Sequence, residues 1–250
     1  MTTIDPKADL RRYLQDARET MLWKLDGLTE RDVRRPLTPT GTNLLGLVKH
    51  LAGVELLYLG WVFDRHYAVP VPWFRPDLGP AGLAPNTDQW ATAEESREYI
   101  VDVYRKAWQH ADVTIEALPL DAVGHVPWWP AQAGAASLHR VLVHLIAETE
   151  RHTGHADIVR ELIDGAVGYR RGTERLPTAD EQWWAAYRDR VAAVAEQSRA
   201  ELSRPGPPTH GGADPLRRRR RTLPGSPFTR PAPPAPELFA VGDQVTLPLE

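Results

Sequence analysis

Four side chains near the middle of the chain are of the kinds that bind metal ions. They are His144, Glu148, His152 and His155, in the stretch HLIAETERHTGH. In an α-helix, a residue four positions further on lies only about 40° round the axis, so the four share one face. A carboxylate and an imidazole four positions apart project side by side, as two ligands of one ion must. The spacing therefore predicts a metal site on a helix.

The helix that must carry this site is predicted to be long. The stretch from Ser137 to Tyr169 has a helical period, and Asp164-Gly165 is a suitable C-terminal stop. Its first half carries an apolar stripe of Leu138, Val141, Leu142, Leu145 and Ile146. The carboxylate and the imidazoles then occupy the positions where this stripe should continue. Burying such groups costs roughly several kcal/mol unless they are paired or bound to a metal.

A second helix is expected to supply a third ligand. His50 lies on the apolar stripe of a predicted helix over 43–67, between Leu47 and Val54. A lone histidine in such a place is more often an ordinary core residue, but a cluster elsewhere that needs a partner favours a ligand. Imidazole and carboxylate suit Zn²⁺ first, and also Ni²⁺, Fe²⁺ or Mn²⁺. With only three protein ligands, His50, Glu148 and His152, positions stay open for water or substrate, as in catalytic sites.

The remaining pattern indicates an all-α protein. Apolar periodicity predicts helices at about 6–28, 43–67, 93–117, 137–165 and 180–202, with no convincing strand between them. Long helices joined by short and long connections are typical of a four-helix bundle, here with an extra C-terminal helix. The bundle is expected to span 5–202. The Pro- and Arg-rich remainder, 203–250, is expected to be a disordered tail.

Composition excludes several classes of function. The chain has 250 residues, a formal net charge of −3 and no cysteine, so disulfides, Cys-based zinc sites and Cys nucleophiles are ruled out. The charge gives no case for nucleic acid, apart from the run Arg217–Arg221, which is more simply a solvated part of the tail. We expect no signal peptide and no membrane span, and therefore a cytoplasmic protein.

A Pro- and Gly-rich connection at 68–92 is long enough to form a lid or a pocket wall. Trp73 and Phe74 in this loop are expected either to line such a pocket or simply to cover the bundle.

The motif LVKHL around His50, with HLIAETERHTGHADIVRELIDG further on, resembles the DinB-like (YfiT-like) metalloenzyme superfamily. The resemblance covers about residues 5–200 and is nearest to its actinobacterial "mini-circle protein" domains. It implies a four-helix bundle, often dimeric, whose metal is held by one His from the second helix and two ligands four positions apart on the fourth. Many members have two His there, followed by Arg-Gly. Glu148 and Thr153-Gly154 depart from that pattern towards the mycothiol-dependent maleylpyruvate isomerases, which use His, Glu and His.

The resemblance further implies thiol chemistry with mycothiol, bacillithiol or glutathione, as an S-transferase or isomerase. A thiol that coordinates the metal is deprotonated, which would supply a nucleophile to a chain without cysteine. His155 is then either a proton shuttle or a structural hydrogen-bonding group, and Arg151 either faces an anionic substrate or pairs around the helix. Two alternatives stay open: a hydrolase whose metal activates water, and a non-catalytic metal- or ligand-binding bundle connected with stress.

Overall fold

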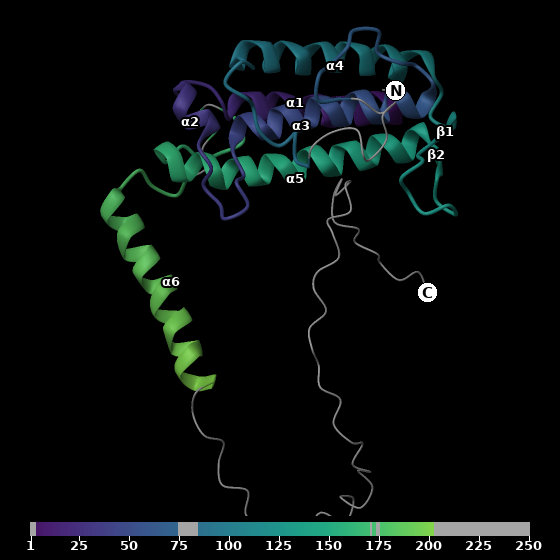
Figure 1. Ribbon diagram of the computed structural model, residues 1–250. Helices are drawn as coiled ribbons and strands as arrows, with labels where there is room; N and C mark the ends of the chain where they lie inside the picture. Colours follow the sequence, from purple (N-terminus) through teal and green to yellow (C-terminus); the bar gives the residue numbers. More distant parts are fainter. Residues whose placement is uncertain (1–3, 75–84, 171, 174–175, 203–250) are drawn as a thin grey trace, which may run out of the picture. The chain divides into compact units, whose positions relative to one another are not determined.

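The computed structural model describes residues 4–74, 85–170, 172–173 and 176–202, with side chains described as far as Ser198. Four long helices, α1 (Pro6–Trp23), α3 (Leu44–Tyr58), α4 (Arg97–Ala117) and α5 (Leu138–Asp164), lie alongside one another as a bundle (Figure 1). Helix α3 packs against both α4 and α5, and α1 packs against α5. The predicted all-α bundle is therefore confirmed.

The helices begin where polar side chains can accept the free amides of the first turn. Asp5 Oδ1 accepts the amide of Lys7 at 3.0 Å, and Asn43 Oδ1 accepts that of Gly46 at 2.8 Å. Ser137 Oγ accepts the amide of Arg140 at 3.2 Å and so starts α5. At the other end of α5, Gly165 takes φ 76°, which only glycine adopts without strain. The predicted bounds of this helix are confirmed.

Two predicted helices end earlier than their periodicity suggested. Helix α1 stops at Trp23, before a series of turns that passes through Gly27 at φ 74°. Helix α3 stops at Tyr58, and the chain turns at Gly60, whose carbonyl accepts the amide of Arg65 at 2.9 Å. The apolar residues that follow form a short 3₁₀ turn, η1 (Trp61–Phe63), so the hydrophobic pattern continues although the α-helix does not.

The connections contain short elements that the sequence did not reveal. Thr29 caps a one-turn helix, α2 (Glu30–Arg34), inside a stretch expected to be plain connector. Strands β1 (Val123–His125) and β2 (Ala135–Ser137) pair antiparallel, so the expectation of no strand is wrong. Each element is too short to establish a period, which explains why periodicity missed them.

One stretch is long and apolar enough to cross a membrane by length and composition alone, although no membrane span was expected. It is Leu44–Phe63, which covers α3 and the turn η1 with 20 residues and a mean hydropathy of 1.3. However, 83% of this apolar window is buried inside the protein. It is the central helix of the bundle, where burial on all sides requires a nearly uniform apolar surface.

Buried charges cross the bundle on the α1–α3–α4 side. Arg18 in α1 is fully buried and donates to both carboxylate oxygens of Glu55 in α3, at 2.6 and 2.7 Å. A third bond, of 3.0 Å, runs from Arg18 to Asp112 in α4. Burial alone would lower the pKa of the guanidinium, but the two carboxylates outweigh it and raise that pKa. Three helices are thus joined by one charge network.

Helix α6 (Glu181–Leu202) belongs to a separate compact unit and is described by itself. The predicted fifth helix is confirmed, and the rings of Trp183 and Tyr187 stack along it at 5.4 Å. The expected disordered tail, 203–250, with its run Arg217–Arg221, lies outside the described residues, so the predicted domain division stays a prediction.

Candidate metal centre

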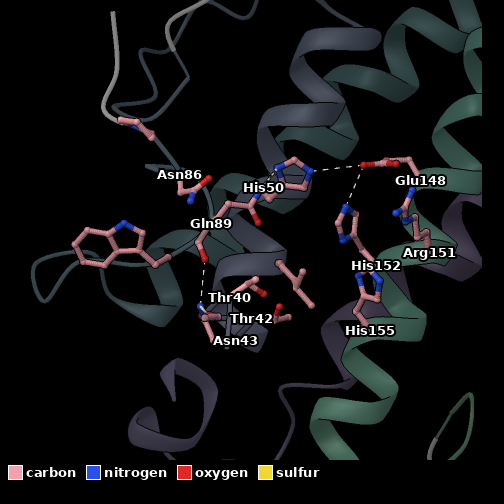
Figure 2. Close-up of a pocket in the computed structure, with 14 residues that line it drawn as sticks. Thr40, Thr42, Asn43, His50, Asn86, Gln89, Glu148, Arg151, His152 and His155 are labelled. Atoms are coloured by element: carbon pink, nitrogen blue, oxygen red, sulfur yellow. Dashed lines mark hydrogen bonds and ion pairs between the residues drawn. The ribbon is translucent and has the colours of Figure 1, made fainter. Parts of the chain in front are cut away.

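Three ionisable side chains from two helices converge in the bundle. His50 comes from α3, and Glu148 and His152 come from α5; the nearest ligand atoms of the three all lie within 4.8 Å of one another. Glu148 Oε1 is 3.0 Å from His152 Nε2 and 3.7 Å from His50 Nε2 (Figure 2). The structure therefore brings together the three residues that the sequence selected, with the carboxylate between the two rings.

The positions of these groups follow from the packing of the helices. Glu148 and His152 lie one turn apart on α5, so their side chains are neighbours. His50 lies on the part of α3 that faces α5, and only 4% of it is exposed, against 7% of Glu148. Ionisable groups buried to this extent must be satisfied by partners or by an ion.

The ring of His50 is held from its other side by a loop. Its Nδ1 lies 2.7 Å from Asp88 Oδ2 and 2.9 Å from Gln89 Nε2. Sequence reasoning missed both residues, because they follow a Pro- and Gly-rich stretch with no period that would place them. The only signal was Asp88 itself, a carboxylate at the end of a loop already expected to form a pocket wall.

The donor set fits a divalent cation. Two imidazoles and one carboxylate are typical ligands of Zn²⁺ and its neighbours in the periodic table. In His152 it is Nε2 that meets the carboxylate, while the buried Nδ1 has no hydrogen-bond partner within the described part of the chain. An ion held by His50, Glu148 and His152 would be accommodated without moving a helix, since the ligand atoms are already close.

The electrostatics of the metal-free site are dominated by its carboxylates. Burial opposes the charged form of His50, but the hydrogen bond to Asp88 and the negative charge of the nearby Glu148 outweigh it and raise the ring pKa to about 9. The hydrogen bond from His152, together with the nearby ring of His50, holds the pKa of Glu148 well below its usual range. At neutral pH the metal-free centre therefore contains an ionised Glu148 and a protonated His50.

These shifts predict how the metal-free protein responds to alkali. Because the pKa of His50 is raised from 6.5 to about 9, its stabilising contribution is complete below pH 6.5 and lost as pH rises through 9. We expect the free energy of unfolding to fall over this interval by at most about 3 kcal/mol. Urea titrations in chelator at several pH values measure it. In His50→Gln the free energy of unfolding should depend less on pH over this interval. An unchanged pH dependence would show that other groups cause it.

The three residues open onto a cavity of about 700 Å³. Its walls come from α5, from the start of α3 with the segment before it, and from the end of the 68–92 loop (Figure 2). They are mostly polar: Thr40, Gly41, Thr42, Asn43, Leu47, His50, Pro85, Asn86, Gln89, Trp90, Glu148, Arg151, His152 and His155. The prediction that the 68–92 loop forms a pocket wall is therefore confirmed for its C-terminal part. Residues 75–84 of this loop lie outside the described residues.

The other residues singled out in the sequence divide between the cavity and the core. Arg151 and His155 line the cavity, and the ring of His155 lies 5.4 Å from that of His152. His144 does not line it and instead packs against Tyr58, with ring centroids 4.7 Å apart. Trp73 is buried in the core and donates to the carbonyl of Lys49, so it covers the bundle rather than the pocket.

Comparison with known families points to the same region. A family model described as mycothiol-S-transferase matches residues 9–165, which include most of α1, all of α2 to α5 and all three convergent residues. No curated protein matches the chain.

Proposed function

Because the chain belongs to the mycothiol-S-transferase family, we propose that it is a divalent-metal-dependent enzyme that transfers a small-molecule thiol to an electrophile. The observation that carries the proposal is the convergence of His50, Glu148 and His152 beside a polar cavity. These three residues would hold the ion, with Zn²⁺ as the first expectation and Ni²⁺, Fe²⁺ or Mn²⁺ as the others. Mycothiol would be the thiol.

The residues around the ion have separate roles in this proposal. When bound, the ion supplies the positive charge that keeps a thiol deprotonated at neutral pH. In the transfer, the thiol sulfur forms a bond to an electrophilic carbon, and the leaving group departs with the bonding electrons. Burial and then the neighbouring charges of His152 and Arg151 lower the pKa of His155, so its ring is neutral and can accept the thiol proton.

The cavity walls suit a polar thiol. Hydroxyl and amide side chains from Thr40, Thr42, Asn43 and Asn86 offer both donors and acceptors to a sugar-like ligand. Arg151 would orient an anionic group of the thiol or of the second substrate. We further propose that the enzyme is cytoplasmic and that it forms a homodimer.

The test combines metal content with thiol transfer. The full chain is expressed in metal-supplemented medium, dialysed, and analysed for metal beside His50→Ala and His152→Ala. We expect about one ion per chain in the wild type and almost none in either variant. Conjugation of mycothiol to a haloacetamide is then followed, with bacillithiol and glutathione as competing thiols.

Each outcome separates one function from another. Metal without thiol binding by calorimetry would favour a non-catalytic metal-binding bundle, and hydrolysis of an ester without thiol would favour a hydrolase. A wild-type protein that retains no metal would overturn the proposal. Binding to nucleic acid with a steep salt dependence, lost when residues 203–250 are removed, would instead indicate a role for Arg217–Arg221.

A further inference from the structure

We infer that Asp88 is a positioning residue of the metal centre, which fixes the ring of His50 so that Nε2 is the nitrogen offered to the ion. The inference rests on the proposed function and deepens it, because it concerns the same centre. It assigns a role to a loop residue that does not line the cavity and that no sequence pattern identified.

The first observation is the contact itself. Asp88 Oδ2 lies 2.7 Å from His50 Nδ1, while the opposite nitrogen, Nε2, faces Glu148 Oε1 at 3.7 Å. A carboxylate accepts hydrogen bonds but cannot donate one, so the Nδ1 facing it must carry a proton. In a neutral ring, the lone pair is then on Nε2, on the side of Glu148 and His152. A carboxylate paired to a ligand in this way fixes the tautomer and raises the basicity of the ring.

Gln89 offers an alternative that the inference must exclude. Its Nε2 lies 2.9 Å from the same His50 Nδ1 and 3.5 Å from Asp88 Oδ2. If this amide donated to an unprotonated Nδ1, the ring proton would be on Nε2 and would obstruct an ion. The carboxylate contact is shorter and carries a full charge, which favours the protonated Nδ1. The amide is then left to donate to Asp88.

The second observation is that the segment that carries Asp88 is hydrogen-bonded to α3 and to its N-cap residue. Asn43 Nδ2 donates to the carbonyl of Gln89 at 3.1 Å. The buried Lys49 donates to the carbonyl of Trp90 at 2.9 Å and pairs with Glu95 at 2.7 Å. These bonds fix the backbone on the C-terminal side of Asp88, so its carboxylate meets the ring with little freedom to move away.

The third observation is a backbone contact that only glycine allows. A Cβ on Gly46 would lie 1.9 Å from the carbonyl oxygen of Gln89. Any side chain there must push the segment off α3. A residue one turn from His50 thus controls the loop indirectly, and a single methyl group should carry Asp88 away from the ring.

The test compares the metal affinity of the wild type with that of three variants. Zn²⁺ affinity is measured by competition with a chromophoric chelator for wild type, Asp88→Ala, Asp88→Asn and Gln89→Ala, in the full chain. We expect Asp88→Ala to bind Zn²⁺ about 10- to 100-fold more weakly. Asp88→Asn should lose less, because its amide oxygen can still accept from Nδ1. Gln89→Ala should stay within about threefold of wild type, since the carboxylate contact alone selects the tautomer. Asp88→Ala within twofold of wild type, or an equal loss in Gln89→Ala, would overturn the inference.

A spectroscopic measurement distinguishes positioning from general loosening of the loop. In the Zn²⁺-loaded wild type, His50 should show a slowly exchanging proton on Nδ1 in an ¹H–¹⁵N correlation spectrum, assigned with His50→Gln. This signal should vanish in Asp88→Ala while the backbone amide signals of Trp90 and Glu95, which are held by Lys49, keep their wild-type positions. A ring proton found on Nε2 would refute the assignment.

Gly46→Ala provides a second route to the same result, with Gly154→Ala as its matched control. A Cβ on Gly154, also within a helix, would meet nothing within 4 Å. We expect Gly46→Ala to weaken Zn²⁺ binding and Gly154→Ala to leave it unchanged; equal affinities would count against the inference. Wild type that binds Zn²⁺ without transferring thiol would overturn the proposed function but not the role of Asp88. Wild type that binds no Zn²⁺ would overturn both.

Discussion

Replacing Glu148 by glutamine is expected to weaken metal binding by more than about 100-fold, which exceeds the usual effect of changing a group outside the ligand set. Glutamine has almost the same shape but no charge, so both His50 and His152 lose the carboxylate that lies between them. The rate of thiol conjugation should fall with the metal content. Elemental analysis after dialysis and chelator competition give the affinity, and conjugation by the dialysed proteins without added Zn²⁺ gives the rate.

His155→Gln is the matched control for this substitution. His155 lies on the same helix and lines the same cavity, but it is outside the group whose ligand atoms converge. Its variant should therefore keep the full metal content, whatever happens to the conjugation rate. Equal metal content in the wild type and Glu148→Gln would contradict the assignment of Glu148 as a ligand.

The second large effect is expected on the stability of the fold rather than on metal binding. Arg18→Met should destabilise the protein by about 3 to 5 kcal/mol, because it leaves Glu55 buried and without its partner. Glu55 is only 1% exposed and accepts two bonds from Arg18, at 2.6 and 2.7 Å. Urea unfolding in chelator measures the change without a contribution from bound metal.

Two further variants test the reason for that loss. Arg18→Met combined with Glu55→Leu removes both charges and should be less destabilised than Arg18→Met alone. Arg11→Ala removes a more exposed arginine of the same helix, which also pairs with Asp112, at 3.1 Å. An exposed pair of this kind contributes at most about 1 kcal/mol. A loss in Arg11→Ala as large as in Arg18→Met would contradict the explanation by burial.

The convergent residues could be predicted because their spacing on α5 is local. A helix fixes the relation between Glu148 and His152, and the apolar stripe around His50 fixes which way that residue faces. The same argument fixed the bounds of α5, where Ser137 and Gly165 have side-chain and backbone properties that few other residues share.

The features that could not be predicted depend on contacts between segments that are far apart in the sequence. Asp88 reaches His50 from a loop, and no period relates the two positions. The pairing of Arg18 with Glu55 was not predicted, because a sequence shows a charged residue but not its buried partner on another helix. The end of α3 was predicted too late for a related reason, since η1 is apolar, with Val62 buried by tertiary packing, and so continues the pattern of the helix.

The division of the proposed ligands between two helices would affect the amount of folded protein in the cell. An ion that binds only the folded chain adds to its stability, by about 2.7 kcal/mol when free metal is a hundred times the dissociation constant. His50 on α3 and the two ligands on α5 are absent as a set from the unfolded chain, so this linkage applies to them. Chains made during metal starvation would unfold more often and be degraded sooner. Metal supply would then control how much of the protein accumulates, as well as how fast each copy works.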